Sequence, residues 1–200
     1  MASAPIRGSP RLSVDVFRGF LEGRPEEERW ELIDGVAVMM APPTLAHQII
    51  AGNLQRLLND ALDVRAPTLI ACQRAGVNIG PSVEHYDPEP DVVVIDTEAA
   101  ETPEERHADR FYLAAEIVSS SERYIESKRE VYKLHGHCKY ILTIQQDRIE
   151  VRADVCTEAG WQDEVLNKRE DLLVLADFGL RCALSDLYRR TSLAPRRASS

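Results

Sequence analysis

Residues 111–119 read FYLAAEIVS, a continuous apolar run with one acid, Glu116, set inside it. A second apolar run, DVVVID at residues 91–96, begins with Asp91. Runs of this length and composition are typical of strands buried on both faces of a sheet. A helical pattern then separates the 111–119 run from a third run, KYILTI at 139–144, and this order of strand, helix and strand allows a parallel crossover. The three runs predict an α/β domain with a central sheet.

The segments around these strands carry clear start and turn signals. Asp34-Gly35 between two short apolar runs at 30–40 predicts a two-residue β-hairpin. Ser13 begins a predicted short N-terminal helix, and Thr44 begins the longest one, over residues 45–63. Ser121 and Gly136 bound a further helix. Weaker patterns predict strands at 68–73, 76–79, 148–154 and 172–175, a charged surface connection at 101–110 and a closing helix within 178–188.

Length and composition limit the class of protein. Two hundred residues with 44% hydrophobic and 28% charged side chains fit one globular domain, which we expect at residues 1–188. Residues 189–200 are basic, contain no acid and are expected to form a disordered tail. No apolar run is long enough to span a membrane, and the first residues do not resemble a secretory signal, so we expect a cytoplasmic protein without a membrane partner. Four cysteines without a CxxC pair predict reduced, mostly buried thiols.

The net charge of −9 argues against nonspecific coating of nucleic acid, and acids are concentrated at residues 84–109. A local basic edge remains open, formed by Arg123, Lys128, Arg129 and Lys133 on the predicted helix and extended by Arg106 and Arg110. The simpler interpretation of that edge is a solvated helix face. The HGHC sequence at 135–138 could supply half of a transition-metal site, but an exposed helix end explains it better.

Asp91 and Glu116 are the candidates for chemistry, because an ionised carboxylate inside a sheet must be paired, hydrogen-bonded or bound to a cation. On neighbouring strands their oxygens could converge on Mg²⁺, which takes one or two carboxylates together with phosphate oxygens. Lys128, early in the following helix, is then the candidate ammonium that orients water or screens developing charge. The alternative is structural: each acid pairs with an arginine, and Lys128 is a solvated helix residue.

Three stretches together resemble the Uma-two family, whose members are classed as endonucleases of the PD-(D/E)XK superfamily. They are WELIDGVAVMMAPPTLAHQ (30–48), PEPDVVVID (88–96) and FYLAAEIVSSS (111–121) followed by SKREVYKLHGHCKYILTI (127–144). The resemblance implies a restriction-endonuclease-like fold, a central mixed sheet flanked by helices. It also implies a catalytic set of Asp91 after Pro90, Glu116 on the next core strand and Lys128 on the following helix. Glu31 and His47 could line the same cleft, and a homodimer is implied.

We therefore expect an endonuclease that hydrolyses phosphodiester bonds in DNA, with Mg²⁺ (or Mn²⁺) bound by Asp91 and Glu116 and with Lys128 assisting. One alternative is a nuclease-fold protein without catalysis that serves as a dimeric binding or assembly module, which the acidic composition favours. Another is a metal-dependent hydrolase of a small phosphate ester, which would use the same carboxylates but needs no basic groove.

Overall fold

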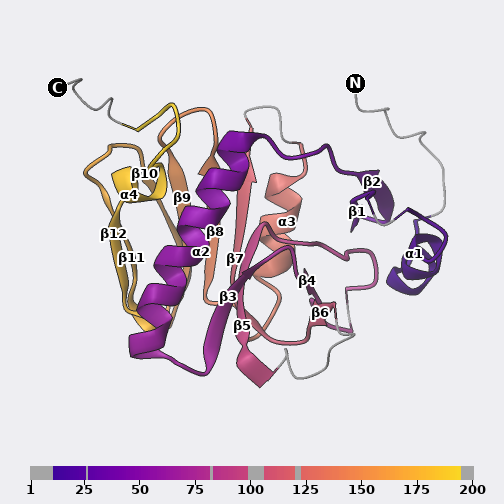
Figure 1. Cartoon of the computed structure of the whole chain (residues 1–200). Helices are drawn as coiled ribbons and strands as arrows, with labels where there is room; N and C mark the ends of the chain where they lie inside the picture. The colour runs from indigo at the N-terminus through magenta and orange to yellow at the C-terminus, as the bar shows by residue number, and fades with distance from the viewer. Residues whose placement is uncertain (1–10, 26, 82, 99–105, 120–122, 195–200) are drawn as a thin grey trace.

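A six-stranded mixed sheet forms the centre of the chain, with strand order β10-β9-β8-β7-β5-β3 (Figure 1). Strands β5 (Val92–Asp96) and β7 (Phe111–Val118) are antiparallel neighbours, and β8 (Tyr140–Gln145) runs parallel to β7. The three apolar runs of the sequence therefore form the middle of the sheet, and the parallel crossover is confirmed. The computed structural model describes residues 11–25, 27–81, 83–98, 106–119 and 123–194.

The other strands complete the sheet or form small separate pairs. Strands β3 (Leu69–Gln73), β9 (Val151–Thr157) and β10 (Gly160–Leu166) extend the central sheet on its two sides. Outside it, three two-stranded pairs are β1 (Trp30–Ile33) with β2 (Val36–Met39), β4 (Gly76–Val77) with β6 (His107–Ala108), and β11 (Leu172–Leu175) with β12 (Leu180–Ala183). The predicted hairpin is confirmed: Asp34 and Gly35 have φ values of 53° and 76°, the left-handed conformation that its turn requires.

Helices α1 and α2 begin where the sequence places their caps. Ser13 accepts a hydrogen bond from Val16 N at the start of α1 (Val14–Leu21), and Thr44 accepts one from His47 N at the start of α2 (Leu45–Arg65). Helix α3 spans Ile125–Tyr132 with Tyr124 at its N-cap and no side-chain cap hydrogen bond, so the prediction that Ser121 caps this helix is wrong. Ser121 itself lies outside the described residues. A short 3₁₀ turn (Ala176–Phe178) and α4 (Leu184–Leu187) follow near the C-terminus.

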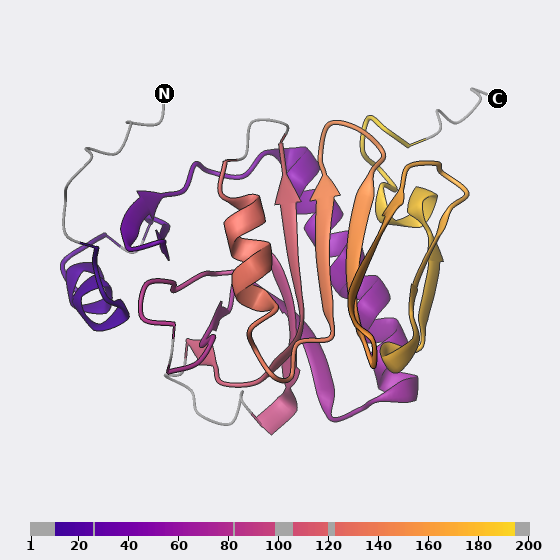
Figure 2. The same cartoon turned by 180° about the vertical axis from the view of Figure 1, so that it is seen from behind.

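Two apolar cores lie on the two faces of the sheet, because successive side chains of a strand point to opposite faces. Helix α2 covers one face, where Val92 and Val94 of β5 meet Leu113 and Ala115 of β7 (Figure 1). Helix α3 covers the other face, where Val93, Ile95 and Ala114 are buried (Figure 2). Helix α1 and the β1-β2 hairpin lie at the side of the molecule opposite the β11-β12 pair (Figures 1 and 2). Among the described residues, no helix is both long and apolar enough to cross a membrane.

Four expectations need correction. Strand β10 was not predicted, because most of its side chains are exposed and it lacks an apolar run. The segment 178–188 contains β12 as well as the closing helix, since Leu180 and Cys182 alternate inward against β11. His107 and Ala108 form strand β6 inside the predicted surface connection.

Cys138 and Cys182 are buried as expected, but Cys156 is exposed. Hydrogen bonds continue into the predicted tail, to Arg189 O and Leu193 N, and residues 195–200 lie outside the described part.

Candidate active site

Asp91 and Glu116 lie next to each other on the face of the sheet that α3 covers. Val92 pairs with Ala115 in the antiparallel register, so continuing that register by one residue places Asp91 opposite Glu116. Glu116 shares its face of β7 with Ala114, which belongs to the core beneath α3. Both acids are buried, with exposed fractions of 6% each. The predicted juxtaposition on neighbouring strands is therefore present.

Helix α3 brings two polar side chains onto Glu116. Lys128 Nζ lies 2.7 Å from Glu116 Oε1, and the hydroxyl of Tyr132 donates a hydrogen bond to the same oxygen. Lys128 and Tyr132 are four residues apart, so they share one face of the helix. Lys128 is only 3% exposed, which excludes the solvated alternative for this side chain.

Strand β1 closes the group with a third carboxylate and its arginine. Glu31 is fully buried, and its Oε2 accepts a hydrogen bond from Lys128 Nζ at 2.8 Å. Arg29, two residues earlier, places Nη2 3.3 Å from Glu31 Oε1 and Nη1 3.2 Å from Asp91 Oδ1. Glu31 thus bridges the two cations, and Arg29 and Lys128 join all three carboxylates into one network.

Asp91 has two further partners. His47, in the first turn of α2, places Nε2 3.0 Å from Asp91 Oδ2, and the backbone N–H of Ile117 donates to the same oxygen at 2.8 Å. Because Thr44 caps α2 at this point, the first turn of the helix brings His47 to Asp91, directly before the first residue of β5. The suggestion that Glu31 and His47 line the cleft is therefore correct in its geometry.

The surroundings give the ionisable groups different proton affinities. Burial raises the pKa of Glu116 to about 7; the Lys128 charge opposes this rise, whereas the charges of Asp91 and Glu31 add to it. Burial also acts against ionised Asp91, but the hydrogen bond and charge of His47, together with Arg29 and Ile117 N–H, outweigh it and lower that pKa. For Lys128, burial is outweighed by Glu116 and Glu31, so its pKa is raised and the group is an ammonium at neutral pH. Lys128 is thus a hydrogen-bond donor and not a base.

A cavity of about 340 Å³ opens onto this network, lined by Asp91, Glu116, Lys128, Arg29 and Glu31 among others. The fit of a cation can be judged from the donors. Two carboxylates from adjacent strands provide hard oxygen ligands, and the mutual repulsion that contributes to the raised pKa of Glu116 would be relieved by a divalent cation. No group of three or more His, Cys, Asp or Glu suited to a metal occurs in the described part of the chain. The donor set therefore fits Mg²⁺, which leaves positions to water and phosphate, better than a fully protein-coordinated metal.

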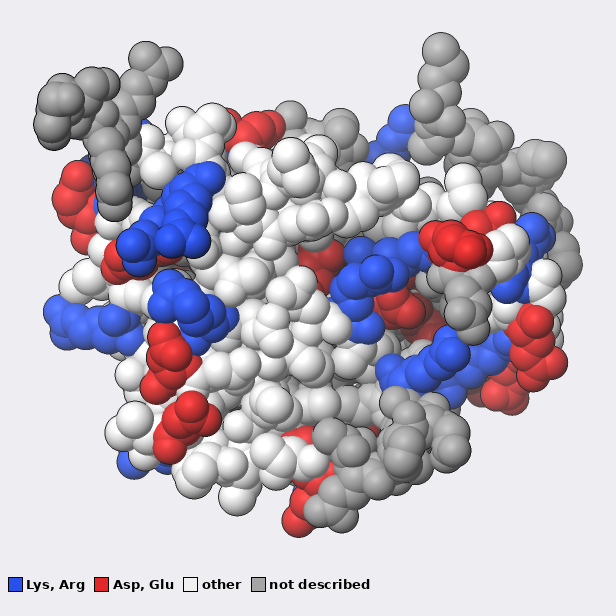
Figure 3. Space-filling view, viewed as in Figure 1, with Lys and Arg blue, Asp and Glu red and all other residues white. Residues whose placement is uncertain are grey.

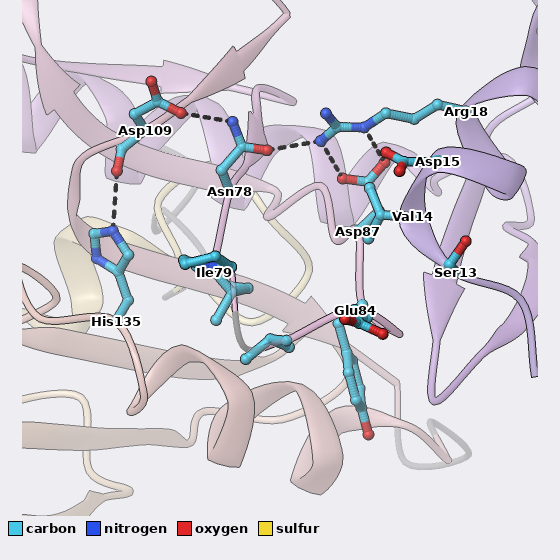
Figure 4. Close-up of a pocket in the computed structure, with 14 residues that line it drawn as sticks. Ser13, Val14, Asp15, Arg18, Asn78, Ile79, Glu84, Asp87, Asp109 and His135 are labelled. Carbon is cyan, nitrogen blue, oxygen red and sulfur yellow. Dashed lines mark hydrogen bonds and ion pairs between the residues drawn. The ribbon is translucent and has the colours of Figure 1, made fainter.

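A larger cavity, of about 810 Å³, lies beside α1 and is lined by none of the predicted catalytic residues (Figure 4). Its polar groups bind one another: Arg18 holds Asp87 through two hydrogen bonds of 2.7 and 3.1 Å, and Asn78 links Arg18 to Asp109. Asp91, Glu116 and Lys128 do not line this cavity, so it does not hold the carboxylate–ammonium group described above.

Two expectations about basic and histidine residues need correction. The basic helix edge is not a solvated face, since Arg129 is 1% exposed and makes hydrogen bonds of 2.9 and 2.6 Å to buried Asp154 of β9. Arg110 pairs with Asp96 at 2.9 Å and is drawn away from that edge. The expected exposed helix end at HGHC is present only in part: His135 is buried against the ring of Phe111, with centroids 4.2 Å apart, whereas Gly136 and His137 are exposed. The HGHC sequence belongs to no metal-binding group among the described residues.

Arg29 and Tyr132 were not identified from the sequence. Arg29 stands two residues before Glu31 in a strand-forming segment, so the alternation of side chains places both on one side. Tyr132 lies one helical turn after Lys128. The sequence alone shows both spacings, but they predict site residues only once Glu31 and Lys128 are known to belong to the site.

The mixed sheet, its flanking helices and the buried carboxylate–ammonium group together define a nuclease-like fold. A family model described as "Putative restriction endonuclease" (Uma2) matches residues 17–185, so the chain belongs to the Uma2 family, the Uma-two family named above. A crystal structure titled as that of "a putative nuclease belonging to DUF820", from Anabaena variabilis ATCC 29413, superposes with a TM-score of 0.68. It is 17% identical and the match covers 88% of this chain and 97% of that one, which supports the fold. No curated protein matches the chain.

Proposed function

We propose that this chain is a Mg²⁺-dependent endonuclease that hydrolyses phosphodiester bonds in DNA, with Mn²⁺ able to replace Mg²⁺. The observation that carries the proposal is the meeting of Asp91, Glu116 and Lys128 on one cavity, with Lys128 Nζ 2.7 Å from Glu116. Membership of the Uma2 family supports the nuclease class. The metal, the DNA substrate and a homodimeric state are parts of the proposal.

Asp91 and Glu116 would hold the metal. When bound, the cation would stabilise the negative charge that develops on a phosphodiester under attack. Asp91 is ready for this role because its lowered pKa keeps it ionised. Glu116 must lose the proton that its raised pKa favours below about pH 7.

Lys128 would orient the attacking water and screen charge on the phosphate. Its ammonium is fixed by Glu116 and Glu31, at 2.7 and 2.8 Å, and this fixed position costs little reorganisation during the reaction. Tyr132 holds Glu116 Oε1 from the same helix face and so orients the carboxylate. Arg29 would contribute positive charge beside Asp91.

The experiment combines calorimetric titration of Mg²⁺ and Mn²⁺ with plasmid nicking. Wild type, Asp91→Asn and Glu116→Gln are compared, and Glu164→Gln on exposed strand β10 serves as the control for removing one acid. We expect metal binding and nicking in wild type and control, and loss of both in the two site variants. Nicking that persists at wild-type rate in Asp91→Asn would refute the assignment.

A catalytically inactive binding or assembly module is the second candidate, and one observation favours it. Arg29 and Lys128 already pair with Asp91 and Glu116, so the network is held together by the chain's own charges. In that case neither metal would bind, no nicking would occur, and Glu116→Gln would leave binding to its partner unchanged. The same titration therefore separates the two functions.

A further inference from the structure

A third cavity, of about 650 Å³, shares Arg29 with the candidate active site. Four arginines line it: Arg24, Arg29, Arg74 and Arg106. Arg29 also lines the carboxylate cavity, so the two spaces adjoin at this side chain. We propose that this arginine cavity binds the phosphodiester backbone of the nucleic acid next to the bond that is cut. The inference rests on the proposed function, for which it assigns the path of the substrate.

The fold places Arg74 and Arg106 side by side, although they are far apart in the sequence. Gly76 pairs with His107 in the parallel β4-β6 ladder, and Gly76 N donates to Arg106 O at 3.0 Å. A Cβ atom at position 76 would collide with the His107 ring, so the close approach of the two segments requires glycine. The small ladder thus fixes two arginine-bearing loops against each other at the cavity wall.

The backbone of Arg74 is unusual. Its φ of +58° lies in the left-handed region, which side chains other than Gly, Asn and Asp rarely adopt. This conformation strains the backbone of a residue other than glycine. Arg74 is exposed and lines the cavity, where a guanidinium can donate hydrogen bonds to phosphate oxygens.

Arg24 is held at the rim by aromatic rings. Its guanidinium carbon lies 4.3 Å from the ring centroid of Phe20 and 5.3 Å from that of Trp30. A guanidinium stacked on rings is oriented in advance but keeps its N–H donors available for an anion. Three arginines from three separate segments therefore surround the space next to Arg29.

Three glutamates, Glu22, Glu28 and Glu89, also line the cavity, and two of them have side-chain partners within the chain. Glu89, which also lines the cavity, faces Arg29 at 3.4 Å, and Glu28 accepts a hydrogen bond from Trp30. In the acid-rich segment, Asp87 is held by Arg18, as Figure 4 shows, and Asp96 by Arg110. Figure 3 shows Lys and Arg side chains on the side of α1, β1 and β6, interspersed there with Asp and Glu side chains. The acidity of the sequence therefore does not exclude a phosphate path here.

The test measures binding of a short labelled DNA duplex by fluorescence anisotropy, without metal and over a range of salt concentrations. The variants are Arg74→Gly, which removes the charge and relieves the backbone strain, and Arg106→Ala. Arg181→Ala on β12, an exposed arginine at the opposite side of the molecule, is the matched control. Plasmid nicking with Mg²⁺ is assayed on the same samples, and thermal unfolding checks that each variant is folded.

We expect each cavity variant to reduce the magnitude of the slope of log K against log salt by about 0.9 and to weaken binding roughly tenfold at low salt. Arg74→Lys should restore most of the slope, whereas Arg181→Ala should leave it unchanged. Slopes in both cavity variants equal to that of Arg181→Ala overturn the inference, even if nicking is intact. Reduced slopes with no nicking in wild type uphold the inference and refute hydrolysis instead. No DNA binding by wild type overturns the inference outright.

Discussion

Replacing Lys128 by Met tests whether the ammonium holds the buried carboxylates together. The substitution keeps the length of the side chain but removes both ion pairs, to Glu116 and to Glu31. Removing one partner of a buried pair leaves an uncompensated charge and costs about 3–5 kcal/mol of unfolding free energy. Glu116 can reduce this cost by binding a proton, since its pKa is already about 7 with Lys128 present.

The sign of the pH dependence follows from that proton. Unfolded Glu116 ionises near its ordinary pKa of 4.5, and folded Glu116 ionises at about 7, so wild-type stability from this group is full below 4.5 and is lost as pH rises through 7. In the variant the folded pKa is higher still, because Lys128 no longer lowers it. We therefore expect the variant to lose a further ~1.4 kcal/mol per pH unit just above pH 7, where wild type is level in this contribution.

Urea unfolding at pH 6, 7 and 8 measures both effects. Lys139→Met is the control, since Lys139 is half exposed and reaches Asp177 only at 3.6 Å, and its removal should stay within about 1 kcal/mol. A loss below about 1 kcal/mol in Lys128→Met that does not change with pH would show that the carboxylates do not depend on this ammonium.

Three further results are expected. Asp154→Ala should lower the unfolding free energy by about 3–5 kcal/mol, because it leaves the buried charge of Arg129 without its partner. In urea unfolding, the double variant Arg129→Met with Asp154→Leu should recover most of this loss. A cost of Asp154→Ala below about 1 kcal/mol would contradict the prediction. Asn59→Ala should cost about 1–3 kcal/mol and promote further association in light scattering, since Asn59 bonds both the N–H and the C=O of Ala71 on edge strand β3. An association state equal to that of wild type would count against it. Mg²⁺ binding should release a proton from Glu116 below about pH 7 and none well above it, as calorimetry in two buffers of different ionisation enthalpy would show; proton release that does not vary with pH would exclude Glu116 as a ligand.

The parts of the fold that the sequence predicted are those where local chemistry and tertiary packing agree. Asp34-Gly35 requires a tight hairpin whatever surrounds it, and Thr44 caps a helix by contacts within its own first turn. Strand β10 was not predicted from the sequence because its side chains are mostly exposed. It pairs with β9 through backbone hydrogen bonds, which leave no apolar pattern in the sequence. Strand β12 was not predicted because its four residues run directly into α4, and the whole segment was assigned to the closing helix.

The sequence predicted the acids of the site but not the network of ion pairs and hydrogen bonds around them. An acid inside an apolar strand is conspicuous, so Asp91 and Glu116 could be identified without any knowledge of the fold. The state of the basic residues depends on distant partners. Arg129 is buried because it forms an ion pair with Asp154 on β9. The spacing of residues within the helix does not reveal that contact. The same holds for Arg29, whose role depends on the β1-β2 hairpin lying beside β5.

Helix α3 is eight residues long, begins without a side-chain cap and contributes Lys128, Arg129 and Tyr132 to contacts with the sheet. A helix this short is not stable in isolation, so its hydrogen bonds form only while those contacts exist. Amide hydrogen exchange along α3 should therefore proceed at the rate of the central strands, as one cooperative unit. Lys128 can hold Glu116 and Glu31 together only while α3 is packed on the sheet, so the site is complete only when the domain is folded.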